Sequence, residues 1–180
     1  RACQQVGLAA EFCADPDRLR HAERVIFPGV GAAGSAMVSV KERGLDEALR
    51  EVISNGCPVL GICLGMQISL DHSEENDTST LGLIEGNVTR FRMDRPDLKV
   101  PHMGWNEVTV RQHHPVLAGL VPGDEFYFVH GYYPTPKDQS AVLATTNYEG
   151  DFACAIGKAS YVGTQFHPEK SGRVGLRLLS

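Results

Sequence analysis

The sequence predicts an α/β protein with a doubly wound, mostly parallel β-sheet and an antiparallel β extension in its C-terminal half. In the N-terminal half, short apolar runs alternate with stretches of helical periodicity, which is the pattern of βα units. In the C-terminal half, short segments rich in β-forming residues follow one another between Pro, Gly, Asn and Asp turns. The 180 residues show no internal repeat and no linker, so we expect a single domain over residues 1–180.

The N-terminal half is expected to alternate strands with helices. Strands are expected at residues 8–13, 24–27 and 58–62. Helices are expected at residues 35–43, 45–54 and 64–70, and a short one, with Asp15 or Asp17 as its N-cap, through His21. In residues 45–54 the apolar side chains recur at i, i+3, i+4, i+7 and i+8, which is the spacing of one helix face.

The C-terminal half is expected to be mostly strand, closed by a helix at residues 173–179. The strands are expected at residues 84–93, 106–111, 125–129, 141–146, 152–156 and 161–165. The chain opens on what looks like the tail of a helix and ends inside another. We therefore expect it to be truncated at both ends and to lack an N-terminal strand, which would lower its stability by exposing a sheet edge.

Composition excludes several classes of protein. The 17 basic and 22 acidic residues give a net charge of −5, which argues against nucleic acid or an anionic membrane as partner. No apolar run approaches the roughly 20 residues of a membrane span, and no signal peptide is recognisable. The five cysteines are scattered and odd in number, so we expect no disulfide framework, no metal site and a reducing compartment, the cytoplasm.

A reactive cysteine is indicated by residues 58–67, Pro-Val-Leu-Gly-Ile-Cys-Leu-Gly-Met-Gln. An apolar strand runs into Gly-x-Cys-x-Gly and then a helix, which is a nucleophile elbow with Cys63 in the place of serine. Gly61 and Gly65 leave room for the tight turn, the helix N-terminus favours a thiolate, and the N–H of Leu64 can donate to an oxyanion. The alternative is a buried core cysteine, but the paired glycines favour the nucleophile.

His167 is the candidate base for this thiol. It follows an expected strand, and Glu169 stands two residues on, where an extended chain would turn both side chains to the same side. Glu169 could then hold the ring of His167 and stabilise its cation. The alternative is a surface His–Glu pair. Among the other histidines, His102 and His130 flank strands and fit either a core or a site wall.

The glycine-rich turn at residues 28–31, Pro-Gly-Val-Gly, follows another expected parallel strand. Its glycines would let backbone N–H groups approach a ligand, so it could supply a second oxyanion donor. It could equally be an ordinary βα turn. It is not a phosphate loop, because the Lys-Ser/Thr pair of such loops is missing.

These motifs, in this order, resemble the class I, triad-type glutamine amidotransferases: residues 28–31, residues 61–67 and Gln-Phe-His-Pro-Glu at 165–169. Residues 101–106 (Pro-His-Met-Gly-Trp-Asn), 127–132 (Tyr-Phe-Val-His-Gly-Tyr) and 167–172 (His-Pro-Glu-Lys-Ser-Gly) are similar to those of glutaminase subunits of imidazole glycerol phosphate synthases. The resemblance spans essentially the whole chain. It implies a flavodoxin-like sheet.

The resemblance also implies roles for individual residues. Cys63, His167 and Glu169 would form a triad that hydrolyses glutamine to glutamate and ammonia without a cofactor. Oxyanion donors would be Gly31 and Leu64. Glutamine would be bound by Gly29, Gln67, Glu75, His130, Gly131 and Tyr132. Gly131 departs from the family, which usually has Ser or Thr there.

The partner implied by the resemblance is a cyclase subunit with a (β/α)8 barrel, in a heterodimer. Ammonia would pass through the interface into that barrel, which makes imidazole glycerol phosphate for histidine synthesis and an aminoimidazole carboxamide ribotide. The interface residues would be Pro101, Trp105, Asn106 and Lys170. Open alternatives are the glutaminase of another class I amidotransferase, a cysteine hydrolase on the same turn, and an inactive assembly partner.

Overall fold

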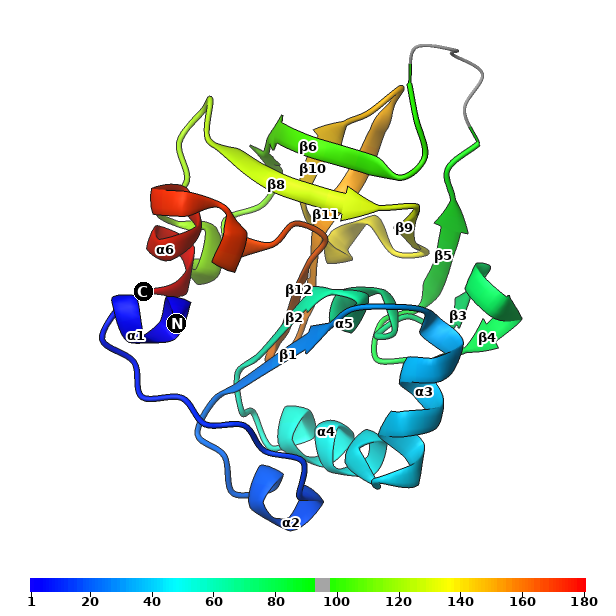
Figure 1. Ribbon diagram of the computed structural model, residues 1–180, viewed down its shortest axis with the longest axis vertical. Helices are drawn as coiled ribbons and strands as arrows, with labels where there is room; N and C mark the ends of the chain where they lie inside the picture. Colours follow the sequence, from blue (N-terminus) through cyan, green and yellow to red (C-terminus); the bar gives the residue numbers. More distant parts are fainter. Residues whose placement is uncertain (93–97) are drawn as a thin grey trace.

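A six-stranded mixed β-sheet forms the centre of the computed structural model, which describes residues 1–92 and 98–180 (Figure 1). Its strands are, in spatial order, β1 (Val25–Gly29), β2 (Val59–Cys63), β12 (Tyr161–Thr164), β11 (Asp151–Lys158), β10 (Val142–Asn147) and β7 (Thr109–Val110). The pairs β1–β2 and β2–β12 are parallel, and the remaining pairs are antiparallel. The predicted combination of a parallel sheet with an antiparallel extension is confirmed.

Two smaller sheets lie beside the central one. A four-stranded sheet has the order β4 (Thr78–Ser79), β3 (His72–Ser73), β5 (Gly86–Arg90) and β9 (Tyr132–Pro136). A two-stranded antiparallel sheet pairs β6 (His102–Glu107) with β8 (Glu125–His130), and Figure 1 shows it above the parallel strands. The strand expected at residues 84–93 is β5, and Met93 lies outside the described residues.

The helices follow the expected order. They are α1 (Ala2–Gln5), α2 (Pro16–Leu19), α3 (Ala33–Glu42), α4 (Leu45–Ser54), α5 (Leu64–Gln67) and α6 (Gly172–Leu179). Short 3₁₀ turns are η1 (Glu75–Asp77), η2 (Pro115–Leu117), η3 (Gln139–Ala141) and η4 (Pro168–Lys170). Asp15 rather than Asp17 caps α2, because its side chain accepts from the N–H groups of Asp17 and Arg18.

Three expectations about elements are wrong. Residues 8–13 form no strand: Phe12 is fully exposed, so this segment buries too little apolar surface to fix it in a sheet. The helix expected at 64–70 already ends at Gln67. The strand expected at 106–111 starts earlier, at His102, and its C-terminal part pairs separately as β7.

Two clusters of buried side chains make up the core. The first joins the inner faces of α3 and α4 to the parallel strands and includes Leu49, Val52 and Tyr161. The second lies between the sheet, β8 and α6 and contains several phenylalanines, with Phe126 and Phe166 at 4.2 Å between ring centroids. The carboxyl ends of β2 and β12 therefore come side by side between the two clusters, where α/β proteins place their sites. No helix in the described part of the chain has the length and apolar character needed to cross a membrane.

Candidate active site

Cys63 sits on a strained turn at the end of β2. It has φ 54° and ψ −110°, a backbone conformation that residues with a Cβ seldom adopt. The two flanking glycines make this turn possible. A Cβ at Gly65 would overlap the carbonyl oxygen of Phe27, and a Cβ at Gly61 would overlap the hydroxyl of Tyr161. The turn is therefore packed so closely against its neighbours that it leaves no room for a larger residue at either glycine.

Replacing Gly65 with alanine is expected to destabilise the protein by about 3 kcal/mol, because the new methyl group meets a strand carbonyl that cannot move aside. Gly119→Ala is the matched control, since a Cβ there makes only ordinary contacts with Arg177 and should change stability by less than about 0.5 kcal/mol. Urea unfolding of both variants measures the difference. Equal midpoints would show that the turn tolerates a side chain.

His167 stands three residues after the end of β12, and a carboxylate holds its ring. Nδ1 of His167 lies 2.7 Å from Oε1 of Glu169, which is in the 3₁₀ turn η4 rather than in an extended stretch. The backbone is fixed as well, because His167 N–H donates to the carbonyl of Tyr127 at 2.9 Å and the Ser171 hydroxyl donates to the His167 carbonyl at 2.6 Å. Nε2 of His167 is buried and has no hydrogen-bond partner among the described residues. This nitrogen is therefore the one free to exchange a proton.

The charge state of His167 is set by opposing effects. Burial disfavours the charged ring, but interactions with Cys63 and Glu169 outweigh it and raise the pKa of His167 to about 9. Nε2 makes no hydrogen bond to the described residues, so Cys63 raises the pKa of His167 by electrostatic attraction. Burial also opposes ionisation of Glu169, yet the adjacent His167 lowers the pKa of its carboxyl.

The raised pKa makes His167 a pH-dependent contributor to stability. Its contribution is complete below its ordinary pKa of 6.5 and is lost as the pH rises through about 9. We expect the difference in free energy of unfolding between the wild type and His167→Asn to shrink over this interval. Urea titrations at a series of pH values measure it, and a difference that stays constant would contradict the assigned pKa.

A cavity of about 340 Å³ opens beside Cys63. Most of the residues predicted for the site line it: Gly31, Cys63, Leu64, Gln67, Glu75, Pro101, His130, Gly131, Tyr132, His167 and Lys170. The thiol and the imidazole therefore face the same space. Val30 and Val129 also line it, and neither was predicted.

The structure places the other predicted residues outside this lining. Glu169 stands behind His167. Gly29 packs against α5, where a Cβ would come within 2.9 Å of Leu64. The Asn106 amide is bound to His102 and to the carbonyl of Asn147. Trp105 is half exposed on β6.

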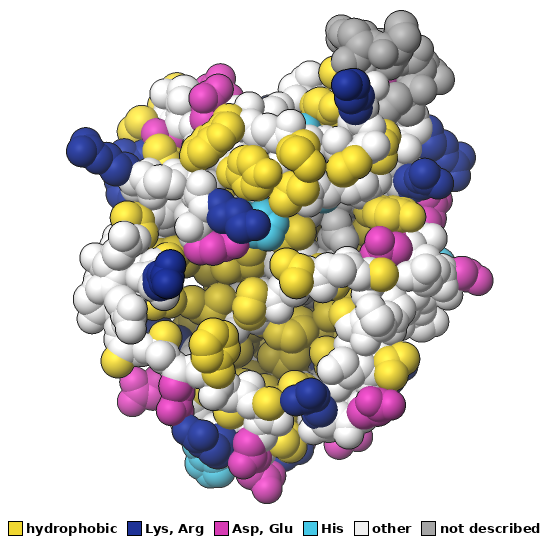
Figure 2. Space-filling model, in the orientation of Figure 1, with side chains coloured by type: hydrophobic (Ala, Val, Ile, Leu, Met, Phe, Trp, Pro, Cys, Tyr) yellow, Lys and Arg dark blue, Asp and Glu magenta, His cyan; other side chains and the backbone are white. Residues whose placement is uncertain are grey.

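An exposed face adjoins the cavity at Lys170, which lines it. We call Trp105, Tyr127 and Lys170 the mouth cluster: the rings of Trp105 and Tyr127 lie 6.0 Å apart, and Nζ of Lys170 lies 6.0 Å from the centre of the Tyr127 ring. Met103, on the same strand as Trp105, is 63% exposed. Figure 2 shows hydrophobic side chains gathered over β6 and β8 on this face. Such a face, with an aromatic residue and a cation at its edge, suits a protein partner.

Two buried histidines lie at one side of the cavity: His130 lines it, and His102 contacts His130 from behind. Nδ1 of His102 lies 3.0 Å from Nε2 of His130, whose Nδ1 lies 2.8 Å from the carbonyl oxygen of Tyr132. Burial lowers the pKa of His130 to about 3 and also lowers that of His102. Neither ring is suited to carry a charge at neutral pH, so of these three histidines His167 is the one whose ring holds a proton there.

Gln165 is a site residue that the sequence analysis missed. It is fully buried, and Nε2 of its amide lies 3.8 Å from Sγ of Cys63. The sequence spacing could have indicated it. Gln165 stands two residues before His167, as Glu169 stands two residues after it, and residues two apart in an extended chain face the same side.

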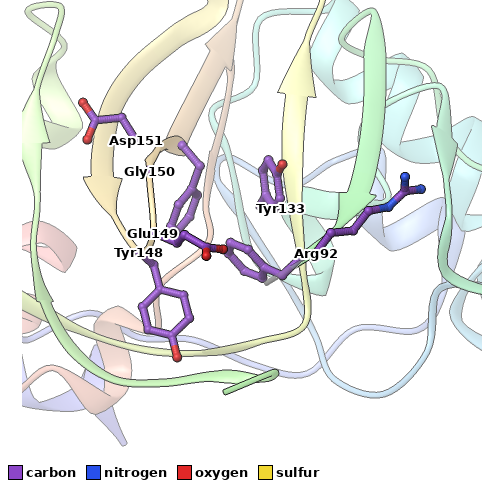
Figure 3. A pocket seen from close by; sticks show the side chains of 8 residues that line it. Arg92, Tyr133, Tyr148, Glu149, Gly150 and Asp151 are labelled. Atoms are coloured by element: carbon purple, nitrogen blue, oxygen red, sulfur yellow. The ribbon is translucent and has the colours of Figure 1, made fainter. Parts of the chain in front are cut away.

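A second, smaller hollow of about 170 Å³ lies at the turn before β11 (Figure 3). Tyr133, Tyr148, Arg92 and Asp151 are among the residues around it. The described residues that line it include no cysteine and no histidine, so it holds no thiol–imidazole pair like that of Cys63 and His167. Among the described residues, no group of three or more His, Cys, Asp or Glu side chains could hold a metal ion.

A nucleophile elbow, an imidazole–carboxylate pair and a shared cavity on a mixed α/β sheet define a class of cysteine-dependent amide hydrolases. The family model for glutamine amidotransferase class-I matches residues 11–179. The chain belongs to this family.

Relatives place the chain more narrowly, among the subunits called HisH of imidazole glycerol phosphate synthase. The HisH subunit of Nitratidesulfovibrio vulgaris (strain Hildenborough) is 48% identical, over 100% of this chain and 86% of that protein. The HisH subunit of Desulfovibrio desulfuricans is 50% identical, over 99% of this chain and 84% of that protein.

Solved structures agree on the fold. A glutamine amidotransferase crystal structure superposes with a TM-score of 0.68 at 20% identity, over 99% of this chain and 90% of that one. The glutaminase domain of Trypanosoma brucei CTPS, with bound acivicin, gives a TM-score of 0.67 at 17% identity, over 99% of this chain and 81% of that one. The similarity confirms the predicted fold.

Proposed function

We propose that this chain is the glutaminase subunit of an imidazole glycerol phosphate synthase and that Cys63, His167 and Glu169 are its catalytic triad. The observation that carries the assignment is the strained Cys63 in one cavity with His167, whose ring Glu169 orients. The family membership and the HisH relatives support the same reaction.

The proposed reaction proceeds through a thioester. The sulfur of Cys63 attacks the side-chain amide carbon of glutamine, and the oxyanion is held by the N–H groups of Leu64 and Gly31. His167 gives a proton from Nε2 to the departing nitrogen, which leaves as ammonia. Nε2 of His167 then takes a proton from a water molecule, whose oxygen attacks the thioester carbon. The carbon–sulfur bond breaks, glutamate leaves, and the site returns to the Cys63 thiolate beside the protonated His167 ring. Glu169 keeps the ring in the required orientation and stabilises its charged form.

Free glutamine needs recognition of both its charged ends. Glu75 lines the cavity and would accept from the α-ammonium group, while one of its oxygens already accepts from the N–H of Ala33 at 2.8 Å. The α-carboxylate would lie against the backbone of residues 130–132. Glycine at position 131 is a mild departure from the family, because a Cβ there would meet only Val100, at 3.5 Å.

The ammonia would be delivered to a cyclase subunit with a (β/α)8 barrel, in the cytoplasm. We place the contact on the mouth cluster, together with Pro101 and Asn106. Pro101 and Lys170 line the cavity itself, so a partner seated here would cover its opening and keep ammonia from solvent.

The decisive experiment is glutamine hydrolysis, measured as ammonia and glutamate released by the chain alone and by the chain mixed with the cyclase and its nucleotide substrate. We expect hydrolysis that rises strongly in the complete mixture and, with it, formation of imidazole glycerol phosphate. Absence of hydrolysis in the complete mixture would refute the proposal.

Truncating Trp105 to alanine is expected to weaken binding of the cyclase by about 2 kcal/mol, roughly thirtyfold in Kd, because tryptophans are enriched among the few interface residues that carry most of the binding energy. Val121→Ala removes a comparably exposed apolar side chain from a turn outside the mouth cluster and should leave Kd unchanged. Titration calorimetry compares the two variants. Equal affinities would place the partner elsewhere.

A further inference from the structure

Gln165 is a polar side chain with no access to solvent, next to the sulfur of Cys63. Its amide Nε2 donates toward Sγ at 3.8 Å, within the range of hydrogen bonds to sulfur. Its backbone N–H donates to the carbonyl of Cys154 on β11 at 2.8 Å, so its position is fixed by the sheet. The aromatic side chain of Phe166 beside it is also completely buried.

The direction of this hydrogen bond is set by a chain of amides. Nε2 of Gln67 donates to the main-chain carbonyl of Tyr132 at 2.8 Å, and a carbonyl can only accept. The same nitrogen donates to Oε1 of Gln165 at 3.0 Å. Gln165 therefore presents its oxygen to Gln67 and its N–H to the sulfur. A flipped amide would bring two N–H groups together on one side and an oxygen against the sulfur on the other.

We infer that Gln165 is a positioning residue that stabilises the anionic form of Cys63 and aims the sulfur into the cavity. A donor bound to a charged acceptor forms a stronger hydrogen bond than one bound to a neutral acceptor, and it does so more effectively in a buried, apolar setting. The inference rests on the proposed function, since it assumes that Cys63 acts as a thiolate. Gln165 is then a second group, besides His167, that stabilises the anionic form of Cys63.

The amide chain also links the thiol to the cavity wall. Both N–H groups of Gln67 are engaged, by Tyr132 and by Gln165, so only its carbonyl oxygen remains to accept from a bound glutamine. A ligand that binds there fixes Gln67 and, through it, the donor that faces the sulfur.

The test follows alkylation of each cysteine by iodoacetamide across a range of pH, resolved by peptide mass spectrometry. In Gln165→Met, the pH at which Cys63 reaches half its maximal rate should rise by about one unit, because a hydrogen bond to the anion is lost. Gln165→Glu should raise it further, since a carboxylate oxygen would face the sulfur. Glutamine hydrolysis at neutral pH should fall about tenfold in Gln165→Met and recover at higher pH.

Thr164→Val is the matched control. Thr164 is equally buried and adjacent, and its hydroxyl donates to the carbonyl of Phe166 at 3.1 Å without touching the sulfur, so the midpoint should stay in place. Cys154 reports on folding, because it is fully buried and reacts only if the core opens. For a measurement that needs no Gln165 variant, the side-chain amide protons of Gln165 should shift in NMR spectra with the midpoint seen for Cys63 alkylation, and should not do so in Cys63→Ala.

The two proposals fail in different ways. The role of Gln165 would be overturned, even if glutamine is hydrolysed, by an unchanged alkylation midpoint in folded Gln165 variants. It would also be overturned if the NMR shifts of the Gln165 amide protons did not change at the midpoint of Cys63 alkylation. A shifted midpoint in a protein that never hydrolyses glutamine would support the hydrogen bond and overturn the proposed function.

Discussion

Replacing Cys63 with alanine is expected to lower kcat for glutamine hydrolysis by at least about a thousandfold, because no other group in the cavity can form the thioester. Alanine keeps the Cβ, so the strained turn and its packing are retained and the loss reports on the sulfur alone. Ammonia release in the presence of the cyclase measures the effect.

Cys57→Ala is the control for this variant. Cys57 is also a free thiol, but it lies outside the cavity and donates to the carbonyl of Ala22 at 3.2 Å. We expect its removal to leave kcat unchanged. Substantial hydrolysis by Cys63→Ala would disprove the thioester route.

Replacing His167 with asparagine is the second large effect, and we expect a loss of about a thousandfold in kcat. Asparagine can still reach Glu169 but has no counterpart of Nε2, so the proton relay to the leaving nitrogen and from water is broken. Raising the pH should not restore the rate, because the missing group is a proton donor as well as a base. The measurement is ammonia release in the presence of the cyclase, across a range of pH.

His72→Asn tests whether the effect is specific. His72 also pairs with a carboxylate, Nε2 to Oδ1 of Asp77 at 2.9 Å, but the pair stands outside the cavity. Its removal should leave hydrolysis intact. Similar losses in both variants would mean that His167 acts through stability and not through proton transfer.

Local sequence patterns were sufficient to predict those elements in which the apolar residues of the pattern are also the buried residues of the structure. The helix predicted at residues 45–54 is α4, because its apolar stripe packs on the sheet and Gly44 precedes it in a left-handed conformation. The turn at Cys63 was predicted because the glycines on both sides of the cysteine have no side chain, so neighbouring backbone can pack closely against the turn. The relation of His167 to Glu169 was expected from spacing, although a 3₁₀ turn, not an extended chain, brings them together.

Other features depend on contacts between distant residues and could not be read from local patterns. Strand β9 contains Pro134 and Pro136, which argue against a strand, but it lies at a sheet edge where the missing N–H groups are tolerated. The direction of the Gln165 amide depends on the Tyr132 carbonyl, which reaches it only through Gln67. Residues 8–13 have the composition of a strand but pair with no strand in the described part of the chain.

The pairing of β2 with β12 joins residues about a hundred positions apart in the chain. During translation, Cys63 leaves the ribosome long before His167 and Glu169 are made. If Cys63, His167 and Glu169 form the proposed triad, a nascent chain carries the thiol without its imidazole, and the proposed hydrolysis can begin only when the last strand docks. Under the proposed function, the order of synthesis alone would keep incomplete chains from releasing ammonia.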